Sequence, residues 1–433
     1  MRINTIKIEK LFEIFDYNIS FSGRENVLII TGPNGFGKTM VLNIIFNLFN
    51  RKFLFFQKLV FEKITIYLQN DTSITISKKS EKDKSHVKFT FIQNGKELDV
   101  FDYSYKLEKD VWNRISRYLP VARISEDTWI DHRTDKILDI DTLLNEYADQ
   151  LPDEISKNIF KIKSPEINKI LDSIKVHLIK EQRLFKKVQN VERNYREDKD
   201  QTIMIETILT YAKELKQLIS QNLQQSFKIS QQLDSSYPDR LVKEKSKLTE
   251  SEYKIRFEKL KEKQEKLSKN GLYESKQQFL GYSQEDSKAL LVYLNDLENK
   301  LSVFDNLLEK LELFTGILNE RRFTYKTIQI DRDKGFYFKT SNGKELDLIQ
   351  LSSGEQHEVV ILYELIFNAK PNTLVLIDEP EISLHVTWQK EFLNDLLKII
   401  KIQNIQVLIA THSPSIINDR WDLVYNLENV SVK

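Results

Sequence analysis

Hydrophobic and polar residues alternate along the first hundred positions as they do in strands. Short apolar runs give way to polar residues and turn at the Asn-Asp of positions 70–71 and the Asn-Gly of positions 94–95. This spacing predicts an antiparallel sheet of hairpins over residues 1–100. The run 27–30 differs because it is wholly apolar, which predicts a buried strand.

Residues 186–315 follow a helical period instead. Glycine is almost absent there, while lysine, glutamate and glutamine abound. Apolar residues recur four and three positions apart at Leu290, Leu294, Leu297, Leu301, Phe304, Leu308 and Leu311, and again at Ile208, Ala212, Leu215 and Ile219. We expect the segments SSYPDR (235–240) and SKNGLYE (268–274) to end helices. The pattern predicts an antiparallel helical hairpin inserted into another domain; an ordinary small helical domain is the alternative.

Residues 316–433 return to a mixed pattern. A strand-like stretch turns at the Ser-Asn-Gly of 341–343, and the order helix (354–367), strand (373–377), helix (387–400), strand (406–410) follows. That order is typical of a parallel sheet with right-handed crossovers. We therefore predict an α/β fold in three segments. Residues 1–185 and 316–433 form two halves of one core, and residues 186–315 form the helical insertion.

The segment TGPNGFGKT (31–39) joins the apolar strand to an apolar helix. Its spacing, G-x-x-x-x-G-K-T, fits a phosphate-binding P-loop. Glycines let backbone N–H groups point into a concavity, and the helix N-terminus adds its dipole to that anion site. We expect the lysine to bind the β- and γ-phosphates of ATP and the threonine hydroxyl to bind Mg²⁺. The ATP-binding candidates here are Asn34, Gly35, Gly37, Lys38 and Thr39.

The segment TLVLIDEPEISLH (373–385) is an apolar strand that ends in two acids, Asp378 and Glu379. Phosphoryl transfer needs an in-line nucleophile and neutralised phosphate charge. We expect Asp378 to hold Mg²⁺ through water and Glu379 to orient or deprotonate the attacking water. Two adjacent acids after a buried strand are costly unless a cation needs them, which disfavours the alternative of a solvated loop.

The segment IQLSSGEQHEVV (349–360) places Ser-Ser-Gly-Glu at the start of an apolar helix. A hydroxyl and free backbone N–H groups at a helix N-terminus form a second anion site. Because one chain rarely needs two γ-phosphate sites, we expect Ser352, Gly354 and Glu355 to act on ATP held by another copy. The alternative is a plain capping box, since Ser followed by Glu three positions later also satisfies that motif.

The segment VLIATHSP (407–414) is a further apolar strand, and it ends at Thr411-His412. A histidine at that position can hydrogen-bond the γ-phosphate and report its loss. A purely structural histidine is the alternative, but the order of the four motifs favours the functional interpretation.

With these four motifs the sequence resembles the ABC-type ATPases. GPNGFGKT resembles the Walker A motif, LSSGE the signature, LVLIDEPE the Walker B motif and ATHSP the switch-histidine strand. DEPEISLH resembles the branch that contains the SMC, RecF and OLD proteins. That resemblance implies an ABC-type P-loop core with an antiparallel β-subdomain. It also implies a Q-loop glutamine that contacts the metal and the water, for which Gln182 in VHLIKEQRLF is the candidate. A helix-surface glutamine is its alternative.

The sequence also resembles the ATPase subunits of prokaryotic anti-phage systems. The resemblance is greatest to the PARIS type, followed by the Septu and retron-associated types. It is carried by LSSGEQHEVVILYELIF, LIDEPEISLHVTWQKEFL and ATHSPSIINDRWDLVYNL. This resemblance implies an ATPase that dimerises or assembles further and controls a nuclease. In PARIS-like systems the nuclease is a separate protein of Toprim type, which is sequestered until a phage protein is sensed. OLD proteins carry that nuclease in the same chain. Only about twenty residues follow ATHSP, so we expect no intrinsic nuclease.

Composition narrows the alternatives. Lys+Arg 65 and Asp+Glu 64 nearly cancel, whereas nucleic-acid binders usually show a basic excess. DNA is a candidate partner only through the stretches 78–88 and 183–193, as in a RecF- or SMC-like repair ATPase. A transporter ATPase is disfavoured by the more than three hundred residues between P-loop and signature.

The sequence contains no cysteine. This excludes disulfides and cysteine-ligated zinc, and it fits a cytoplasmic protein. No apolar run approaches the roughly 20 residues that span a bilayer, and the N-terminus does not read as a secretory signal. We therefore expect no membrane partner.

Overall fold

The protein is described from a computed structural model of its 433 residues. The structure describes residues 1–21, 26–81, 84–102, 119–125, 128–132, 136–139, 142–143, 147, 162, 164–180, 183–189, 202–273, 281–321, 323–382 and 384–429. The chain forms two compact units. The first unit comprises residues 1–181, 369–382 and 389–433, and the second comprises residues 182–368 and 383–388.

A parallel sheet is the centre of the first unit. Its strands run in the order β11 (Lys175–Ile179), β17 (Thr373–Asp378), β18 (Gln406–Ala410), β3 (Val27–Thr31) and β19 (Val424–Asn426). Every neighbouring pair is parallel. The helix α1 (Lys38–Phe49) packs on β11, β17 and β18. Because β3, β17 and β18 are almost entirely buried, they are continuous apolar runs rather than alternating ones.

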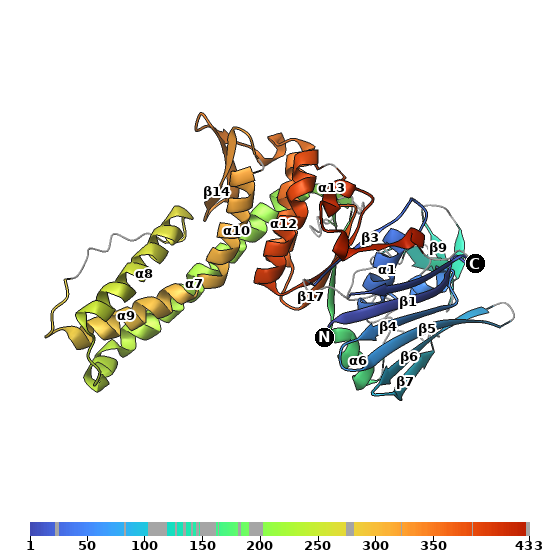
Figure 1. Ribbon diagram of the computed structural model, residues 1–433, viewed down its shortest axis with the longest axis horizontal. Coiled ribbons are helices and arrows are strands. Elements are labelled where there is room, and N and C mark those ends of the chain that lie inside the picture. Colours follow the sequence, from blue (N-terminus) through green and yellow to red (C-terminus); the bar gives the residue numbers. More distant parts are fainter. Residues whose placement is uncertain are drawn as a thin grey trace. The chain divides into compact units, whose positions relative to one another are not determined.

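An antiparallel sheet of hairpins adjoins this core within the same unit (Figure 1). Its order is β2 (Phe15–Ser20), β1 (Ile3–Leu11), β4 (Lys63–Leu68), β5 (Thr72–Glu81), β6 (Lys84–Gln93) and β7 (Lys96–Asp102). The hairpin turns fall at residues 70–71 and 94–95, where all four residues have positive φ. The predicted antiparallel sheet is therefore confirmed.

Smaller elements complete the first unit. They are α2 (Leu54–Lys58), β8 (Val121–Arg123), β9 (Thr128–Asp131), β10 (Ile137–Asp139), α6 (Pro165–Asp172), α12 (Val386–Gln403, whose first residues belong to the second unit) and α13 (Pro414–Ile417). Helix α12 connects β17 to β18, so the predicted β-α-β order is present.

The second unit is mainly helical. It contains α7 (Thr207–Lys243), α8 (Glu250–Lys269), α9 (Ser287–Ser302), α10 (Asp305–Arg321) and α11 (Ser353–Tyr363), which continues as a π-helical turn, Glu364–Asn368. It also contains the hairpin of β12 (Phe185–Gln189) and β13 (Thr202–Glu206) and the sheet of β14 (Lys326–Asp331), β15 (Gly335–Thr340) and β16 (Glu345–Leu346). Together with the parallel core, these elements confirm the predicted α/β class with an inserted helical segment.

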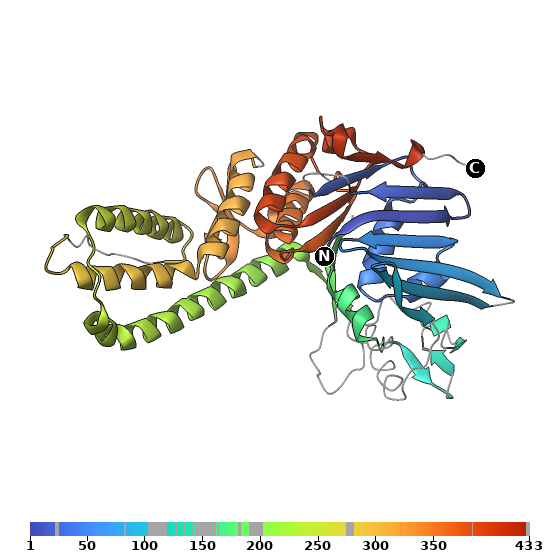
Figure 2. The ribbon, with the colours of Figure 1, turned by 60° about the horizontal axis from the view of Figure 1, so that its bottom comes forward.

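Figure 2 shows the long helices of the second unit, and ion pairs define their directions. Residues later in α7 pair with residues earlier in α9: Arg240 binds Asp296, whereas Asp234 binds Lys300. The two helices are therefore antiparallel, as a helical hairpin requires. Helix α8 instead runs parallel to α9 and α10, because its residues 256, 263 and 266 pair with 298, 305 and 312.

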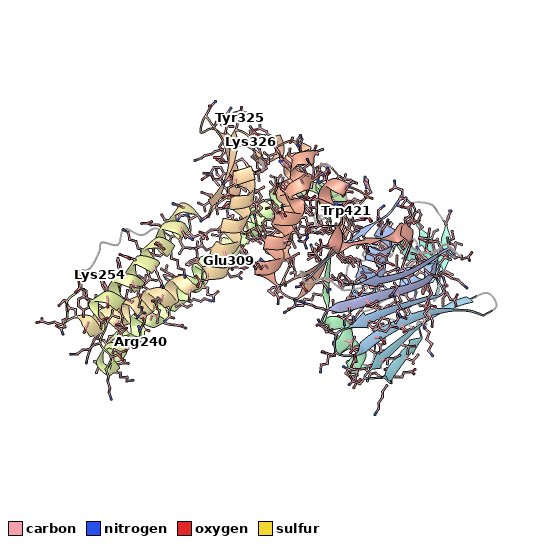
Figure 3. All side chains as sticks on the ribbon, viewed as in Figure 1. Arg240, Lys254, Glu309, Tyr325, Lys326 and Trp421 are labelled. Carbon is pink, nitrogen blue, oxygen red and sulfur yellow. The ribbon has the colours of Figure 1, made fainter. Side chains whose placement is uncertain are left out.

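The predicted helix end at residues 235–240 is wrong. Helix α7 continues through Pro238 to Lys243. Arg240 explains the continuation, because its guanidinium donates to the Leu233 carbonyl at 2.6 Å and forms a bidentate pair with Asp296, which is buried (Figure 3). The predicted end at 268–274 is confirmed, since α8 stops at Lys269. The seven-residue seam is buried throughout, but it is divided between α9 and α10, with Phe304 in the turn between them.

Gly335 is required where β15 approaches α7. Its φ is +81°, and an added Cβ would lie 2.0 Å from the Ala212 carbonyl oxygen. We expect Gly335→Ala to lower the free energy of unfolding of this unit by more than about 3 kcal/mol, because left-handed strain adds to an overlap with backbone. Thermal unfolding measures the change. Gly343→Ala is the matched control, since Gly343 has φ +78° with open space around it; an equal loss for both variants would contradict the account.

Candidate active site

The P-loop is formed between the end of β3 and the start of α1. Gly37 caps α1 with φ +82°, a backbone conformation that favours glycine. Lys38 is 5% exposed, and its Nζ donates to the carbonyls of Gly32 at 2.8 Å and Pro33 at 3.3 Å. Asn34 and Gly35 are exposed at the loop tip. The glycine-rich loop therefore joins β3 to α1 as predicted, and its role in phosphate binding stays a prediction.

Thr39 and Asp378, the two residues predicted to bind Mg²⁺, lie side by side. The Thr39 hydroxyl donates to Oδ1 of Asp378 at 3.0 Å, although the two residues are 339 positions apart in sequence. A hydroxyl and a carboxylate are hard oxygen ligands of the kind that Mg²⁺ takes together with phosphate oxygens and water. The pair fits that ion. Within the described residues no group of three or more acidic, histidine or cysteine side chains could hold a metal ion by itself.

Glu379 follows at the carboxyl end of β17. Its φ is +43°, a conformation that costs free energy for a residue with a side chain. Its backbone N–H donates to the Ala410 carbonyl at 2.8 Å, which fixes the turn against the end of β18. The Glu379 carboxylate lies 3.7 Å from Nδ1 of His412. Thus the end of β17 and the residues after β18 meet, as their parallel register predicts.

Glu381 is a residue that the motif analysis did not single out. It is 7% exposed, and its Oε1 accepts hydrogen bonds from the Thr411 hydroxyl at 2.7 Å and from the His412 backbone N–H at 3.0 Å. The same oxygen lies 3.1 Å from Nδ1 of His412. The available signal was an acid between the apolar residues Pro380 and Ile382.

The signature residues lie in the second unit, at the start of α11. Ser352 caps the helix: its hydroxyl accepts from the Glu355 N–H at 3.4 Å, and its own N–H donates to the Glu355 carboxylate at 2.9 Å. Lys326 on β14 donates to both Glu355 oxygens at 2.8 Å (Figure 3). Burial raises the pKa of Glu355, but the hydrogen bonds from Lys326 and Ser352 lower it more, so the pKa lies below its usual range. The capping box is therefore present.

An open hollow lies over this helix start. Its volume is about 500 Å³, and it is lined by Thr324, Ser352, Gly354, Glu355, Leu384, His385 and Trp388. His385 is held by a 2.8 Å hydrogen bond between its Nδ1 and the Thr387 hydroxyl. The capping role of Ser352 and Glu355 thus coexists with an accessible polar surface, and the role of Ser352, Gly354 and Glu355 on a second copy's ATP stays a prediction.

Two further predictions concern residues near the unit boundary. Gln182, the Q-loop candidate, lies outside the described residues, so its role stays a prediction. Arg183 begins one of the basic stretches, but it is 6% exposed and its Nε donates to Nδ1 of His357 at 3.1 Å. Burial, and then the charge of Arg183, lower the pKa of His357 to about 4. Arg183 is therefore an internal residue and not part of a basic surface.

Lys78 begins the other basic stretch and also turns inward. Its Nζ donates to the carbonyls of Gln57 at 2.7 Å and Leu59 at 3.0 Å, and burial lowers its pKa. Both candidate DNA-binding stretches thus begin with a cation that is not free to meet phosphate.

Comparison with known proteins gives a match over nearly the whole chain. Residues 1–417 match the family described as "AAA ATPase domain". "Protein ea59" of Escherichia phage lambda is 29% identical over 161 residues, which cover 36% of this chain and 30% of that protein. The "Retron Ec83 probable ATPase" of Escherichia coli is 27% identical over 145 residues, covering 28% and 26%. "Lipoprotein-releasing system ATP-binding protein LolD" of Rickettsia typhi is 38% identical over 80 residues, covering 18% and 34%. The chain spans about a third or less of each of these relatives.

The solved structures that match the chain include SMC head domains. The head from Pyrococcus furiosus with an extended coiled coil, bound to the C-terminal domain of ScpA, has a TM-score of 0.40 at 12% identity and covers 100% of this chain and 94% of that one. The head from Thermotoga maritima has a TM-score of 0.34 at 11% identity, covering 98% and 94%. Among the described residues, no helix is long and apolar enough to cross a membrane.

Proposed function

Because the chain belongs to the AAA ATPase domain family, we propose that it is the ATP-hydrolysing subunit of a cytoplasmic anti-phage complex. Two copies sandwich ATP, and the closed state controls a separate nuclease, of Toprim type, in response to a phage protein. The relative from retron Ec83 supports the defence context. It favours a retron-associated system over the PARIS type to which the motifs were first compared.

The hollow at the start of α11 is the observation that best supports an ATP site shared between two copies. Backbone N–H groups at a helix start attract anions, and here the hollow is also lined by Ser352 and the exposed His385. Glu355 is held in place by Lys326 and Ser352. These groups suit the terminal phosphate of an ATP molecule that another copy holds at its P-loop.

The hydrolytic roles divide among the residues of the first unit. Lys38 and the backbone of residues 35–39 hold the phosphates. Thr39 and Asp378 would hold Mg²⁺, with Gln182 as a further candidate, and a bound Mg²⁺ neutralises the charge of the phosphates. Glu379 orients the water, and His412 responds to the γ-phosphate. Closure by a second copy completes the site, so hydrolysis depends on assembly.

The length of the helices in the second unit argues against the alternative of an SMC-like repair ATPase. The longest helix of that unit, α7, has 37 residues and is therefore about 55 Å long. That length is short for a tether between distant DNA segments. It is sufficient for a surface that binds a partner protein, which is the role we propose for it.

Co-expression of the Glu379→Gln protein with the product of its neighbouring gene tests the proposal. The mass of the purified complex is measured by light scattering with and without ATP, and Lys38→Ala serves as the control with weakened ATP binding. The proposal predicts a large complex that contains a nuclease and changes with ATP. A lone dimer that captures DNA with ATP would support the repair alternative instead.

Ser352→Arg is expected to spare ATP binding and abolish turnover, because arginine fills the hollow that receives the second copy's ATP. ATP affinity and steady-state hydrolysis are both measured. Ser164→Arg is the matched control, since Ser164 is likewise an N-cap whose side chain accepts from a backbone N–H, and losing a cap costs about 1 kcal/mol. Normal turnover in Ser352→Arg would argue against the shared site.

A further inference from the structure

Glu381 is a buried carboxylate beside His412, which also lies near the predicted hydrolytic residue Glu379. Two donors converge on its Oε1, the Thr411 hydroxyl at 2.7 Å and the His412 backbone N–H at 3.0 Å, and Nδ1 of the His412 imidazole lies 3.1 Å from the same oxygen. Its Oε2 is buried without a hydrogen-bond partner among the described residues. Burying a charge costs free energy unless hydrogen-bond donors compensate it. A buried and only partly compensated carboxylate therefore suggests a functional role.

The imidazole of His412 lies between two carboxylates. Its Nδ1 is 3.1 Å from Glu381 and 3.7 Å from Glu379. A nitrogen that faces a carboxylate carries the proton, because a carboxylate only accepts. The other ring nitrogen, Nε2, is then left for a ligand, and it donates to a phosphate oxygen when it carries a proton as well. The His412 side chain is 54% exposed, so a ligand can reach it.

The segment around Glu381 is fixed by further hydrogen bonds. The Ser413 N–H donates to the Thr411 hydroxyl at 3.0 Å, and the Ser413 hydroxyl donates to Oε1 of Gln389 at 3.0 Å. Nε2 of Gln389 in turn donates to the Glu381 carbonyl at 3.2 Å. These bonds join the residues after β17 to those after β18, so Glu381 is held in one place.

We propose that Glu381 is the positioning residue for His412. It binds Nδ1 of the imidazole, keeps His412 from pairing with Glu379 and so leaves the Glu379 carboxylate free for water. This inference rests on the ATPase site of the proposed function, but not on a nuclease partner. Without the Glu381 carboxylate, Glu379 becomes the nearest acid to the imidazole, and the two groups on which hydrolysis depends would neutralise each other.

A double-mutant cycle tests the proposal. Glu381→Gln keeps the size and an acceptor oxygen but removes the charge. We expect it to lower kcat about tenfold while KM for ATP stays within about twofold, because Glu381 does not touch the nucleotide. In a His412→Ala background the same change should have little further effect. A kcat within twofold of wild type, or effects that multiply in the double variant, would overturn the proposal.

Two measurements separate positioning from folding. Glu381→Gln should not lower the melting temperature, since a neutral group is less costly to bury. In the wild-type protein, nitrogen NMR of the six histidines, with His412 assigned by its absence in His412→Ala, should show the Nδ1-protonated ring. An Nε2-protonated neutral ring would overturn the proposal whether or not turnover is fast. Failure to find a nuclease partner would leave these results unchanged.

Discussion

Replacing Lys38 by alanine is expected to weaken ATP binding by about one to two orders of magnitude. Lys38 begins α1 beneath the glycine-rich loop, where its ammonium now bonds two loop carbonyls. An ammonium in this position binds the β- and γ-phosphates with charge-assisted hydrogen bonds, which are stronger than neutral ones. Alanine removes those bonds, and isothermal titration with ATP measures the loss.

Lys63→Ala is the control for Lys38→Ala. Lys63 is a half-exposed lysine on β4, within the same unit, and its ion pair with Glu9 is long at 4.0 Å. Its removal should leave ATP affinity unchanged. If Lys38→Ala also bound ATP with unchanged affinity, the assignment of the loop as the phosphate site would be wrong.

Replacing Glu379 by glutamine is expected to leave ATP binding intact and to lower turnover about 10²- to 10⁴-fold. Glutamine preserves the size of the side chain, but it no longer has the charge that orients or deprotonates water. The ATP-bound state then persists, so the closed dimer should accumulate. Steady-state hydrolysis measures the first effect, and light scattering with ATP measures the second.

Glu97→Gln is the matched control, because Glu97 is an exposed acid on β7 of the antiparallel sheet. It should hydrolyse ATP at the wild-type rate. A Glu379→Gln protein that retained wild-type turnover would move the catalytic role to another residue at this edge of the sheet.

The parallel core could be predicted because its strands are continuous apolar runs, and their carboxyl ends must share one edge. Asp378 ends such a strand and therefore lies beside Thr39, to which it is hydrogen-bonded. The apolar seam of the helical segment could also be predicted, because its residues recur at the helical period and every one of them is buried.

Features that depend on contacts between distant residues could not be predicted. Local propensity ends a helix near Pro238, but Arg240 and the buried Asp296 override it. The positive φ of Glu379 has no sequence signature. The role of Glu381 depends on where the residues after β18 lie, which is a property of the sheet and not of the motif in which Glu381 occurs.

Mixing two inactive variants tests the shared ATP site most directly. Lys38→Ala lacks a working P-loop and Ser352→Arg lacks a working signature, so a mixed dimer of the two has one intact site. With random exchange of copies, the mixture should recover about a quarter of wild-type turnover, since half of the dimers are mixed and each has one of two sites. If mixed dimers form and the mixture stays inactive, ATP is not shared between two copies in the way proposed.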